Sequence, residues 1–235
     1  MDFSFSSDQQ DLRELAAKIL SDATTLERTK QVVADSDGFD RDLWAALADA
    51  GIIGISLPES VGGAGLGYLE TCIVLEEVGR TAAPIPALAV MALAAPALVE
   101  FGATDALDGV AAGTSIVTAA LTEAVGDVHA PTTTASGGKL NGEKVCVPAG
   151  LDAKAIVVSA ADGLYLVDPS ASGVTVERED TCSARRPPAW CCATPRPPSW
   201  PAPRVWPGCS SGRTPRSASP CRGSPTRRST SPRRT

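Results

Sequence analysis

The chain has 235 residues, of which 43% are hydrophobic, and a formal net charge of −6. This length is enough for one large domain or two small ones with a buried core. The average charge hides a division, because residues 1–180 carry 10 basic and 27 acidic residues, whereas residues 181–235 carry 11 Arg and no acid. The acidic part is therefore unlike a nucleic-acid-binding surface, and the polar start MDFSFSSDQQ is unlike a signal peptide.

Helical periodicity predicts four helices in the first half of the chain. Ser7 and Gln10 have the spacing of a capping box, so the first helix follows from about Asp8. The later helices are expected from about Asp40 to Gly51, from Leu69 to Val78 with Gly79 as the stop, and from Pro86 to near Gly102. The last segment contains the apolar stretch PIPALAVMALAAPALVEF, which Pro96 interrupts. We expect a buried helix there and no membrane span, which needs ~20 strongly apolar residues.

The periodicity changes near Gly113, where short β-branched runs begin. Five strands are predicted in TSIVTAAL, KLNGEKVCVP, AKAIVVSA, GLYLVD and GVTVERE, separated by Gly, Asp and Ser. Helices followed by strands favour two packed units over alternating βαβ. The predicted fold is therefore α+β: a helical domain over residues 1–113, a small antiparallel β-barrel or sheet domain over 114–180, and a disordered tail over 181–235.

Three features that suggest chemistry are better explained structurally. The run GGAGLG lacks the preceding strand of a dinucleotide-binding loop, so we expect a glycine turn that lets two helices approach closely. His129, the only histidine, has no acid or cysteine at ligand spacing and is expected in a loop. Glu76 and Glu77 are adjacent on a predicted helix and point in different directions, which predicts a solvated face and no paired-carboxylate site.

The cysteines divide as the charge does. Cys72 and Cys146 lie in apolar runs, which predicts buried, reduced thiols and a cytoplasmic protein. The other five cysteines lie in the tail without the C-x-x-C spacing of a zinc site, so no metal site is predicted.

Three stretches in order resemble the acyl-CoA dehydrogenase family over about residues 5–180. FDRDLWAALADAGIIGISLPESVGGAGLGYLETCIVLEEVGRTAAPIP (39–86) is similar to the family's N-terminal helical region. AALTEAVGD (119–127) resembles its first flavin-contacting strand with the Thr-Glu signature, and KLNGEKVCVPAGLDAKAIVVSA (139–160) resembles the next hairpin and strand, with residues 141–144, up to Lys144, at the turn.

The resemblance implies a helical domain, a central β-domain and a C-terminal four-helix domain, with FAD between them. It also implies α,β-dehydrogenation of an acyl-CoA thioester, in which a carboxylate removes the α-proton and the flavin receives the β-hydride. The implied partners are the acyl-CoA substrate, further acyl-CoA dehydrogenase subunits in a homo- or hetero-oligomer, and an electron-transfer flavoprotein. No membrane or nucleic-acid partner is implied.

Five residues are expected along the flavin by resemblance. Ala119, Leu121 and Thr122 match the first strand, and Cys146 and Pro148 fall where the family often has Trp and Thr. Cys146 is smaller than Trp, and Pro148 offers neither an N–H nor a hydroxyl group. These departures allow a second interpretation, in which the chain is the subunit of a heteromer that lacks flavin contacts.

A further departure follows the Thr-Glu signature. Ala124 stands where the family often has proline, and the serine and full spacing of its Gly-Ser-Asp are absent here. The family's catalytic glutamate comes from the C-terminal helical domain, so no catalytic residue is assigned to this chain.

The tail takes the place of that domain. If one nucleotide were lost near codon 181, each true codon would consist of the third base of one written codon and the first two bases of the next. Cys and Trp codons begin with T, so each would place T at the centre of a true codon. Codons with a central T encode only apolar residues. With GC-rich free bases, the displaced frame from Val205 permits VAGLLERAHAALCVALQGFADEALDLTAE, which has an apolar helical period. The hypothesis is that residues from about 181 onward are an out-of-frame translation. The alternative is a genuine Arg/Pro/Ser-rich tail that binds a polyanion.

Overall fold

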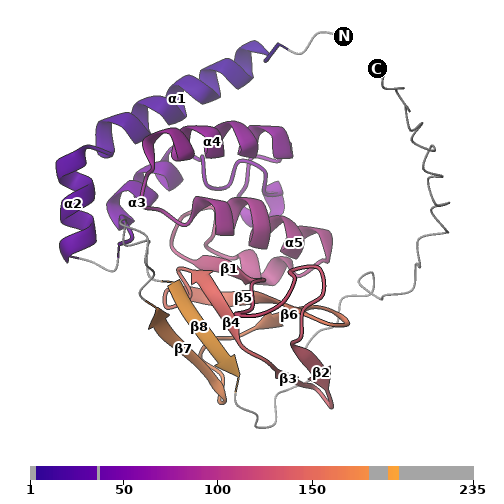
Figure 1. Cartoon of the computed structure of the whole chain (residues 1–235). Coiled ribbons are helices and arrows are strands. Elements are labelled where there is room, and N and C mark those ends of the chain that lie inside the picture. The colour runs from indigo at the N-terminus through magenta and orange to yellow at the C-terminus, as the bar shows by residue number, and fades with distance from the viewer. Residues whose placement is uncertain (1–3, 36–37, 180–189, 196–235) are drawn as a thin grey trace, which may run out of the picture.

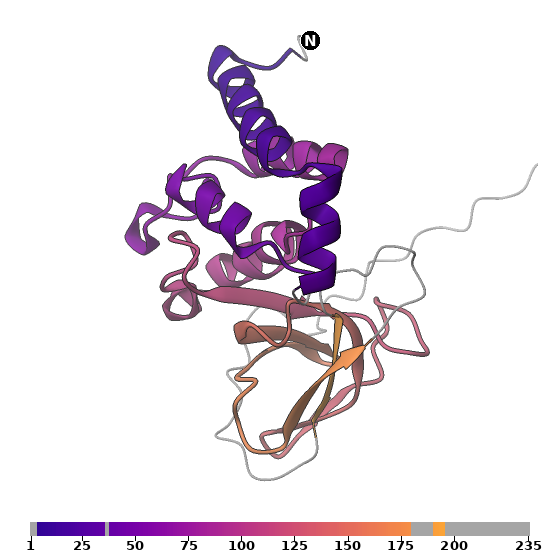
Figure 2. The same ribbon diagram turned by 90° about the vertical axis from the view of Figure 1, so that its left-hand side faces the viewer.

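The computed structural model describes residues 4–35, 38–179 and 190–195. A helical half stands on a β half (Figures 1 and 2). The helices are α1 (Ser7–Ala23), α2 (Leu26–Asp35), α3 (Arg41–Asp49), α4 (Tyr68–Thr81) and α5 (Ala95–Glu100), with two 3-10 helices, η1 (Glu59–Val61) and η3 (Thr104–Leu107), and the π-helix η2 (Leu88–Ala94). The strands are β1 (Ile116–Ala120), β2 (Thr134–Ser136), β3 (Lys139–Asn141), β4 (Lys144–Pro148), β5 (Ala153–Ala160), β6 (Gly163–Val167), β7 (Val174–Glu179) and β8 (Trp190–Pro195).

The predicted helices are present, with one addition and one shifted cap. The addition is α2, which is amphipathic but has Val32 alone buried among its described side chains. The capping box at the start of α1 is formed by Ser6 and Gln9, so its prediction at Ser7 and Gln10 is wrong by one residue.

The two later helices also differ at their ends. α4 continues through Gly79 to Thr81 and ends where Ala82 adopts a left-handed φ of 50°, so the predicted stop at Gly79 is wrong. The fourth predicted helix is divided into η2 and α5, and Pro96 lies in the first turn of α5. A proline is tolerated there because its missing N–H lacks an intrahelical partner in any case.

The strands form three small sheets with the orders β1-β5-β6, β2-β3 and β4-β8-β7. β1 pairs with β5 in parallel, which corrects the prediction of an antiparallel domain, while the other named strand pairs are antiparallel. Parallel pairing of β1 and β5 is possible because the connection over residues 121–152 is long enough for a crossover, whereas a tight hairpin joins only antiparallel strands.

One strand lies inside the segment predicted as a disordered tail. The backbone of β8 pairs with β4 on one side and β7 on the other. A third strand satisfies backbone groups that β4 and β7 would otherwise leave at open edges. The rest of the tail, and with it most of the out-of-frame hypothesis, lies outside the described residues.

The sheet β1-β5-β6 separates two apolar clusters. Along β6, Leu164 and Leu166 pack against the cluster shared with the helices, whereas Tyr165 and Val167 belong to the cluster on the other face. This alternation is the two-residue period of a strand with both faces covered. The helical half therefore packs directly on the β half, and Arg41 adds an ion pair across to Asp152 (Nη2 to Oδ1, 2.6 Å).

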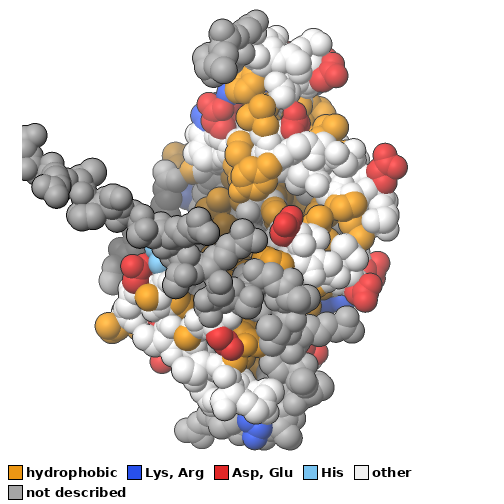
Figure 3. All heavy atoms as spheres, turned by 90° about the vertical axis from the view of Figure 1, so that its right-hand side faces the viewer, with side chains coloured by type: hydrophobic (Ala, Val, Ile, Leu, Met, Phe, Trp, Pro, Cys, Tyr) orange, Lys and Arg blue, Asp and Glu red, His pale blue; other side chains and the backbone are white. Residues whose placement is uncertain are grey.

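The helical half also exposes large apolar side chains. Figure 3 shows hydrophobic side chains gathered over the helical part of one face. Among the exposed residues of the molecule are Tyr68 and Leu69 of α4 and Leu88 of η2, and the Tyr68 hydroxyl donates to the Ala92 carbonyl (3.2 Å), which places the start of α4 beside η2. Within the described part of the chain, no helix is long and apolar enough to cross a membrane.

Candidate functional site

The five residues expected along the flavin lie on two neighbouring segments. Ala119 is buried in β1, and the chain beyond β1 presents Leu121, which is half-buried, and Thr122, which is exposed. Cys146 and Pro148 lie in β4, and both are half-buried. β1 and β4 are close in space, as Figure 1 also shows, so the structure brings the five residues together.

Two hydrogen bonds join these segments at their two ends. The Thr118 hydroxyl donates to the Pro148 carbonyl (2.6 Å), and the Val145 amide donates to the Thr122 carbonyl (2.9 Å). Between these bonds, Cys146 adopts a left-handed φ of 57°, and the register of β4 shifts against β8 between residues 144 and 147. This bulge re-aims the side chains of β4, as bulges next to binding sites commonly do.

A buried ion pair lies immediately beyond the second hydrogen bond. Lys144 Nζ contacts Glu123 Oε1 at 2.7 Å, and the two side chains are 2% and 7% exposed. Lys144 also donates to Ser159 Oγ on β5 (3.0 Å), and Ser159 donates in turn to the Leu121 carbonyl (3.4 Å). The sequence places Lys144 at a turn, whereas it begins β4 and is buried.

Both oxygens of the Glu123 carboxylate are occupied. The amide and hydroxyl of Thr132 donate to Oε2 at 2.7 and 2.5 Å, and those of Thr133 donate to Oε1 at 2.9 and 2.6 Å. Burial raises the pKa of Glu123, but the hydrogen bonds from Lys144 and the two threonines outweigh it and hold the pKa well below its ordinary value. Glu123 is therefore ionised and unsuited to accept a proton.

Gly142 allows the chain to pass close to this carboxylate cluster. A Cβ atom at Gly142 would overlap the Thr133 hydroxyl, which donates to Glu123. The sequence gives no warning of this cluster, because Glu123, Thr133 and Lys144 are far apart in the chain. The one available signal is the lysine at the head of an apolar strand, where a charge needs a partner if it is buried.

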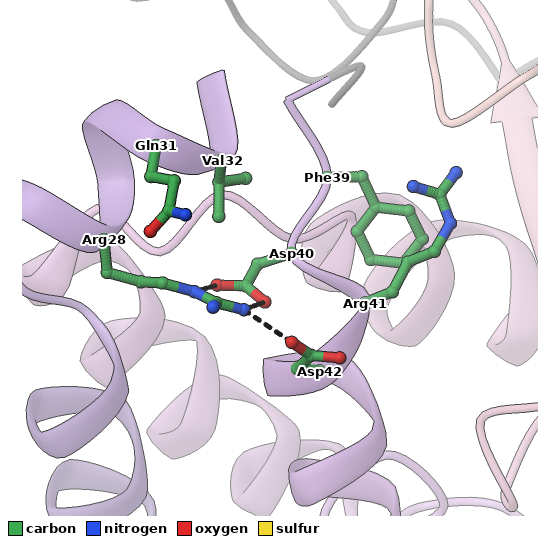
Figure 4. Close-up of a pocket in the computed structure, with 7 residues that line it drawn as sticks. All are labelled: Arg28, Gln31, Val32, Phe39, Asp40, Arg41 and Asp42. Carbon is green, nitrogen blue, oxygen red and sulfur yellow. Dashed lines mark hydrogen bonds and ion pairs between the residues drawn. The ribbon is translucent and has the colours of Figure 1, made fainter. Parts of the chain in front are cut away.

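A polar pocket in the helical half holds a second group of charged side chains, which water reaches (Figure 4). Its volume is about 280 Å³, and Arg28 extends across it to both carboxylate oxygens of Asp40 (3.1 and 2.9 Å) and to Asp42 (2.7 Å). Asp40 also caps α3 by accepting from the Leu43 amide (3.1 Å). The hydrogen bonds to Asp40 and Asp42 raise the pKa of Arg28. Arg28, Asp40 and Asp42 satisfy one another, and Arg41 pairs instead with Asp152, so the charges of this pocket stabilise the fold.

The glycine run GGAGLG precedes α4 and follows η1, so it lacks the strand that a dinucleotide-binding loop requires. A Cβ atom at Gly63 would overlap the Leu57 carbonyl, and Gly62 and Gly65 have positive φ values of 80° and 69°. The expected turn is present. The close approach at Gly63 is to its own loop, however, because Leu57 precedes η1, which corrects the expectation of two approaching helices.

The other residues singled out in the sequence lie in a loop and on α4. His129 is exposed in the loop between β1 and β2, as expected. Glu76 is exposed, but Glu77 is 8% exposed at its side chain and pairs with Arg80 (Nε to Oε2, 2.6 Å), so a solvated face is wrong for Glu77. Cys72 is exposed on α4, which corrects its predicted burial. No group of metal-ligating side chains occurs in the portion of the chain that the structure describes.

Comparisons with known proteins agree with this architecture. Residues 6–113 match the family model "Acyl-CoA dehydrogenase, N-terminal domain". The chain is 35% identical over 185 residues to "Acyl-CoA dehydrogenase FadE27" of Mycobacterium tuberculosis. The matched region covers 75% of this chain and 50% of that protein. It is similar to the solved "Tcur3481-Tcur3483 steroid ACAD G363A variant" (38% identity, TM-score 0.73, 83% of this chain and 55% of that chain). It is also similar to a chain of the "ChsE4-ChsE5 complex" from Mycobacterium tuberculosis (30% identity, TM-score 0.72, 83% and 56%).

The helical half and the β half thus define a class of two-part oxidoreductase folds. The chain belongs to the acyl-CoA dehydrogenase family. It spans about half the length of the curated relatives that it matches.

Proposed function

We propose that this chain is the helical and central β portion of an FAD-dependent acyl-CoA dehydrogenase, which introduces an α,β double bond into an acyl-CoA thioester. The observation that carries the proposal is the surface formed by the end of β1 and the bulged strand β4. That surface brings together the five residues expected along the flavin, and two hydrogen bonds, from Thr118 to Pro148 and from Val145 to Thr122, fix its two ends. The cytoplasmic location remains a prediction.

The residues at this surface fit a flavin in their chemistry. Leu121, Cys146 and Pro148 are partly exposed and apolar, which suits the face of an aromatic ring, and Thr122 offers an exposed hydroxyl beside them. When bound, the flavin would supply the hydride acceptor of the reaction. The contribution of this chain is to bind and orient that ring, because binding geometry governs the rate of such a transfer.

The proton-abstracting base is assigned to the C-terminal helices of the family fold, by resemblance. Glu123 is the carboxylate beside the proposed flavin surface, and its two oxygens accept from Lys144, Thr132 and Thr133. A carboxylate held in this way does not take the α-proton. We therefore expect little or no dehydrogenase activity from the 235-residue chain by itself.

A second candidate is a subunit of a heteromeric acyl-CoA dehydrogenase whose flavin contacts come mainly from a partner subunit. The ChsE4-ChsE5 complex, to which the chain is 30% identical, supports this candidate. Cys146 and Pro148 support it too, because they offer less to a flavin than the Trp and Thr common at these positions. The acyl-CoA substrate, the oligomer and an electron-transfer flavoprotein as electron acceptor are all parts of the proposal.

The test is a titration of the purified 235-residue chain with FAD, followed by addition of acyl-CoA substrates without oxygen. We expect FAD to bind and to remain oxidised, because the base is assigned elsewhere. Bleaching of the flavin by an acyl-CoA would overturn the expectation of inactivity. If FAD binds only after co-expression with a second family subunit, the heteromer is the correct form of the proposal.

A further inference from the structure

We infer that Glu123 and Lys144 are positioning residues, whose buried ion pair fixes the end of β1 against the bulge of β4 and so sets the shape of the surface that faces the flavin. The inference rests on the proposed function, because it assigns the pair a role toward that cofactor. Neither side chain is among the five expected to lie along the flavin.

The place of the pair in the strands supports this role. The Thr122 carbonyl accepts from the Val145 amide, and the ion pair joins the next residue along one segment to the preceding residue of the other. The pair therefore lies directly beside the last hydrogen bond between the two segments. Any movement of Glu123 relative to Lys144 is passed to Thr122 and Cys146 through one or two backbone units.

The same carboxylate closes the loop over residues 124–131. Glu123 stands before this loop, and Thr132 and Thr133, which follow it, donate four hydrogen bonds to its two oxygens. The loop itself is largely exposed, with Val125 at 84% and Val128 at 48% exposure. Within the loop, Asp127 accepts from the amides of His129 and Ala130 and so forms a turn. Because the loop buries little apolar area of its own, the anchoring at its two ends holds this turn against the strands.

Lys144 extends the cluster to a third strand. Its ammonium group donates to Ser159 Oγ on β5, and Ser159 donates to the Leu121 carbonyl. The end of β1 is thereby held by β5 on one side and by β4 on the other. Such fully satisfied buried networks hold neighbouring groups in a single arrangement.

Four variants of the full chain test the inference. Glu123→Gln and Lys144→Met each remove one charge, and the double variant E123Q/K144M leaves no charge buried without a partner. Asp108→Asn is the matched control, because Asp108 and Lys154 form an exposed pair (3.7 Å, 89% and 53% exposed) away from this surface. The measurements are the dissociation constant for FAD, the visible circular dichroism of bound FAD, the thermal midpoint, and hydrogen exchange in peptides over residues 121–133.

We expect Glu123→Gln and Lys144→Met each to weaken FAD binding about tenfold or more and to alter the flavin dichroism. The double variant should regain most of the thermal midpoint, whereas its FAD affinity stays low and the 121–133 peptides exchange faster than in the wild-type chain. Asp108→Asn should behave as the wild type.

Two outcomes would overturn the inference while sparing the proposed function. One is wild-type FAD affinity and dichroism in Glu123→Gln, and the other is joint recovery of stability and FAD affinity in the double variant, which a merely structural pair would give. A third outcome, in which the wild-type chain fails to bind FAD with or without a partner subunit, overturns the proposed function and the inference together.

Discussion

The two charged clusters of this molecule differ in burial, and the difference shows what each does. In the helical half, Arg28 is 39% exposed and bridges the buried Asp40 (2% exposed) and the exposed Asp42, so water shares the charge of the cation. In the β half, Lys144 and Glu123 are nearly enclosed, and each must be satisfied by the protein. A cluster whose cation is reached by water can lose an exposed member such as Asp42 at small cost, whereas an ion pair with both members buried leaves an uncompensated charge when it loses one.

Removing the buried lysine should have the largest effect. Lys144→Ala leaves Glu123 buried with its threonine donors alone, and we expect a loss of about 3–5 kcal/mol in the free energy of unfolding. Urea unfolding of the purified chain measures it. A loss below that of a surface-pair variant would show that the threonines alone satisfy Glu123.

Acid should act on the same cluster. The pKa of Glu123 is lower in the folded than in the unfolded chain, so its stabilising contribution is present above the ordinary glutamate pKa and is lost as the pH falls below it. Burial raises the pKa of Asp40, but its hydrogen bonds from Arg28 and Leu43 lower it overall, so Asp40 acts in the same sense. We expect Glu123→Gln to flatten the acid limb of a stability–pH curve more than Asp40→Asn does. Equal flattening would contradict the contrast in burial.

Filling the space beside the cluster should have an intermediate effect. In Gly142→Ala the new methyl group overlaps the Thr133 hydroxyl, and we expect a destabilisation of about 1–3 kcal/mol. Gly79→Ala is the matched control, because a Cβ at this exposed position of α4 meets nothing within 4 Å. It should instead stabilise the chain by about 0.5–1 kcal/mol. Thermal melts of both variants give the two signs.

The helical cluster should respond more weakly. Asp40→Ala removes the cap of α3 together with an ion pair whose cation is partly exposed, for which we expect a loss of about 1–2 kcal/mol. Asp42→Ala, at an 87% exposed side chain, serves as the control and should cost less. Equal losses for the two variants would mean that the ion pairs with Arg28 matter more than the cap.

The smallest effect is expected at Lys154. Its pair with Asp108 is long and exposed, so Lys154→Ala should change the free energy of unfolding by less than about 0.5 kcal/mol. Urea unfolding at low and high salt checks this. A larger loss would show that this pair helps to hold the two halves together.

The sequence predicts local elements well where one segment decides them. β5 matches the predicted run AKAIVVSA because a continuous apolar strand needs no information from elsewhere. The capping box is displaced because Ser6 and Gln9 have the same spacing as Ser7 and Gln10. Sequence also places the five residues expected along the flavin on two segments, but only by family resemblance.

The sequence fails where the answer depends on distant partners. The family resemblance assigns Lys144 to a turn, and its burial stays hidden because its partner Glu123 lies in another segment. The parallel pairing of β1 with β5 is hidden for the same reason, since an apolar run carries no mark of strand direction. Burial of Glu77 depends likewise on the packing of α1 against α4.

That parallel pairing has a consequence for how the chain is made. All five residues of β1 are buried in the finished protein, yet its partner β5 is complete only after residues 121–160 have been added. At roughly 5–20 residues per second, this apolar strand waits about 2–8 s for its partner. During that interval the helices, already synthesised, are the available cover for its face. Because the helices are made first, they can cover β1 before β5 is available. This limits the time in which an apolar strand without its sheet partner could pair with another chain.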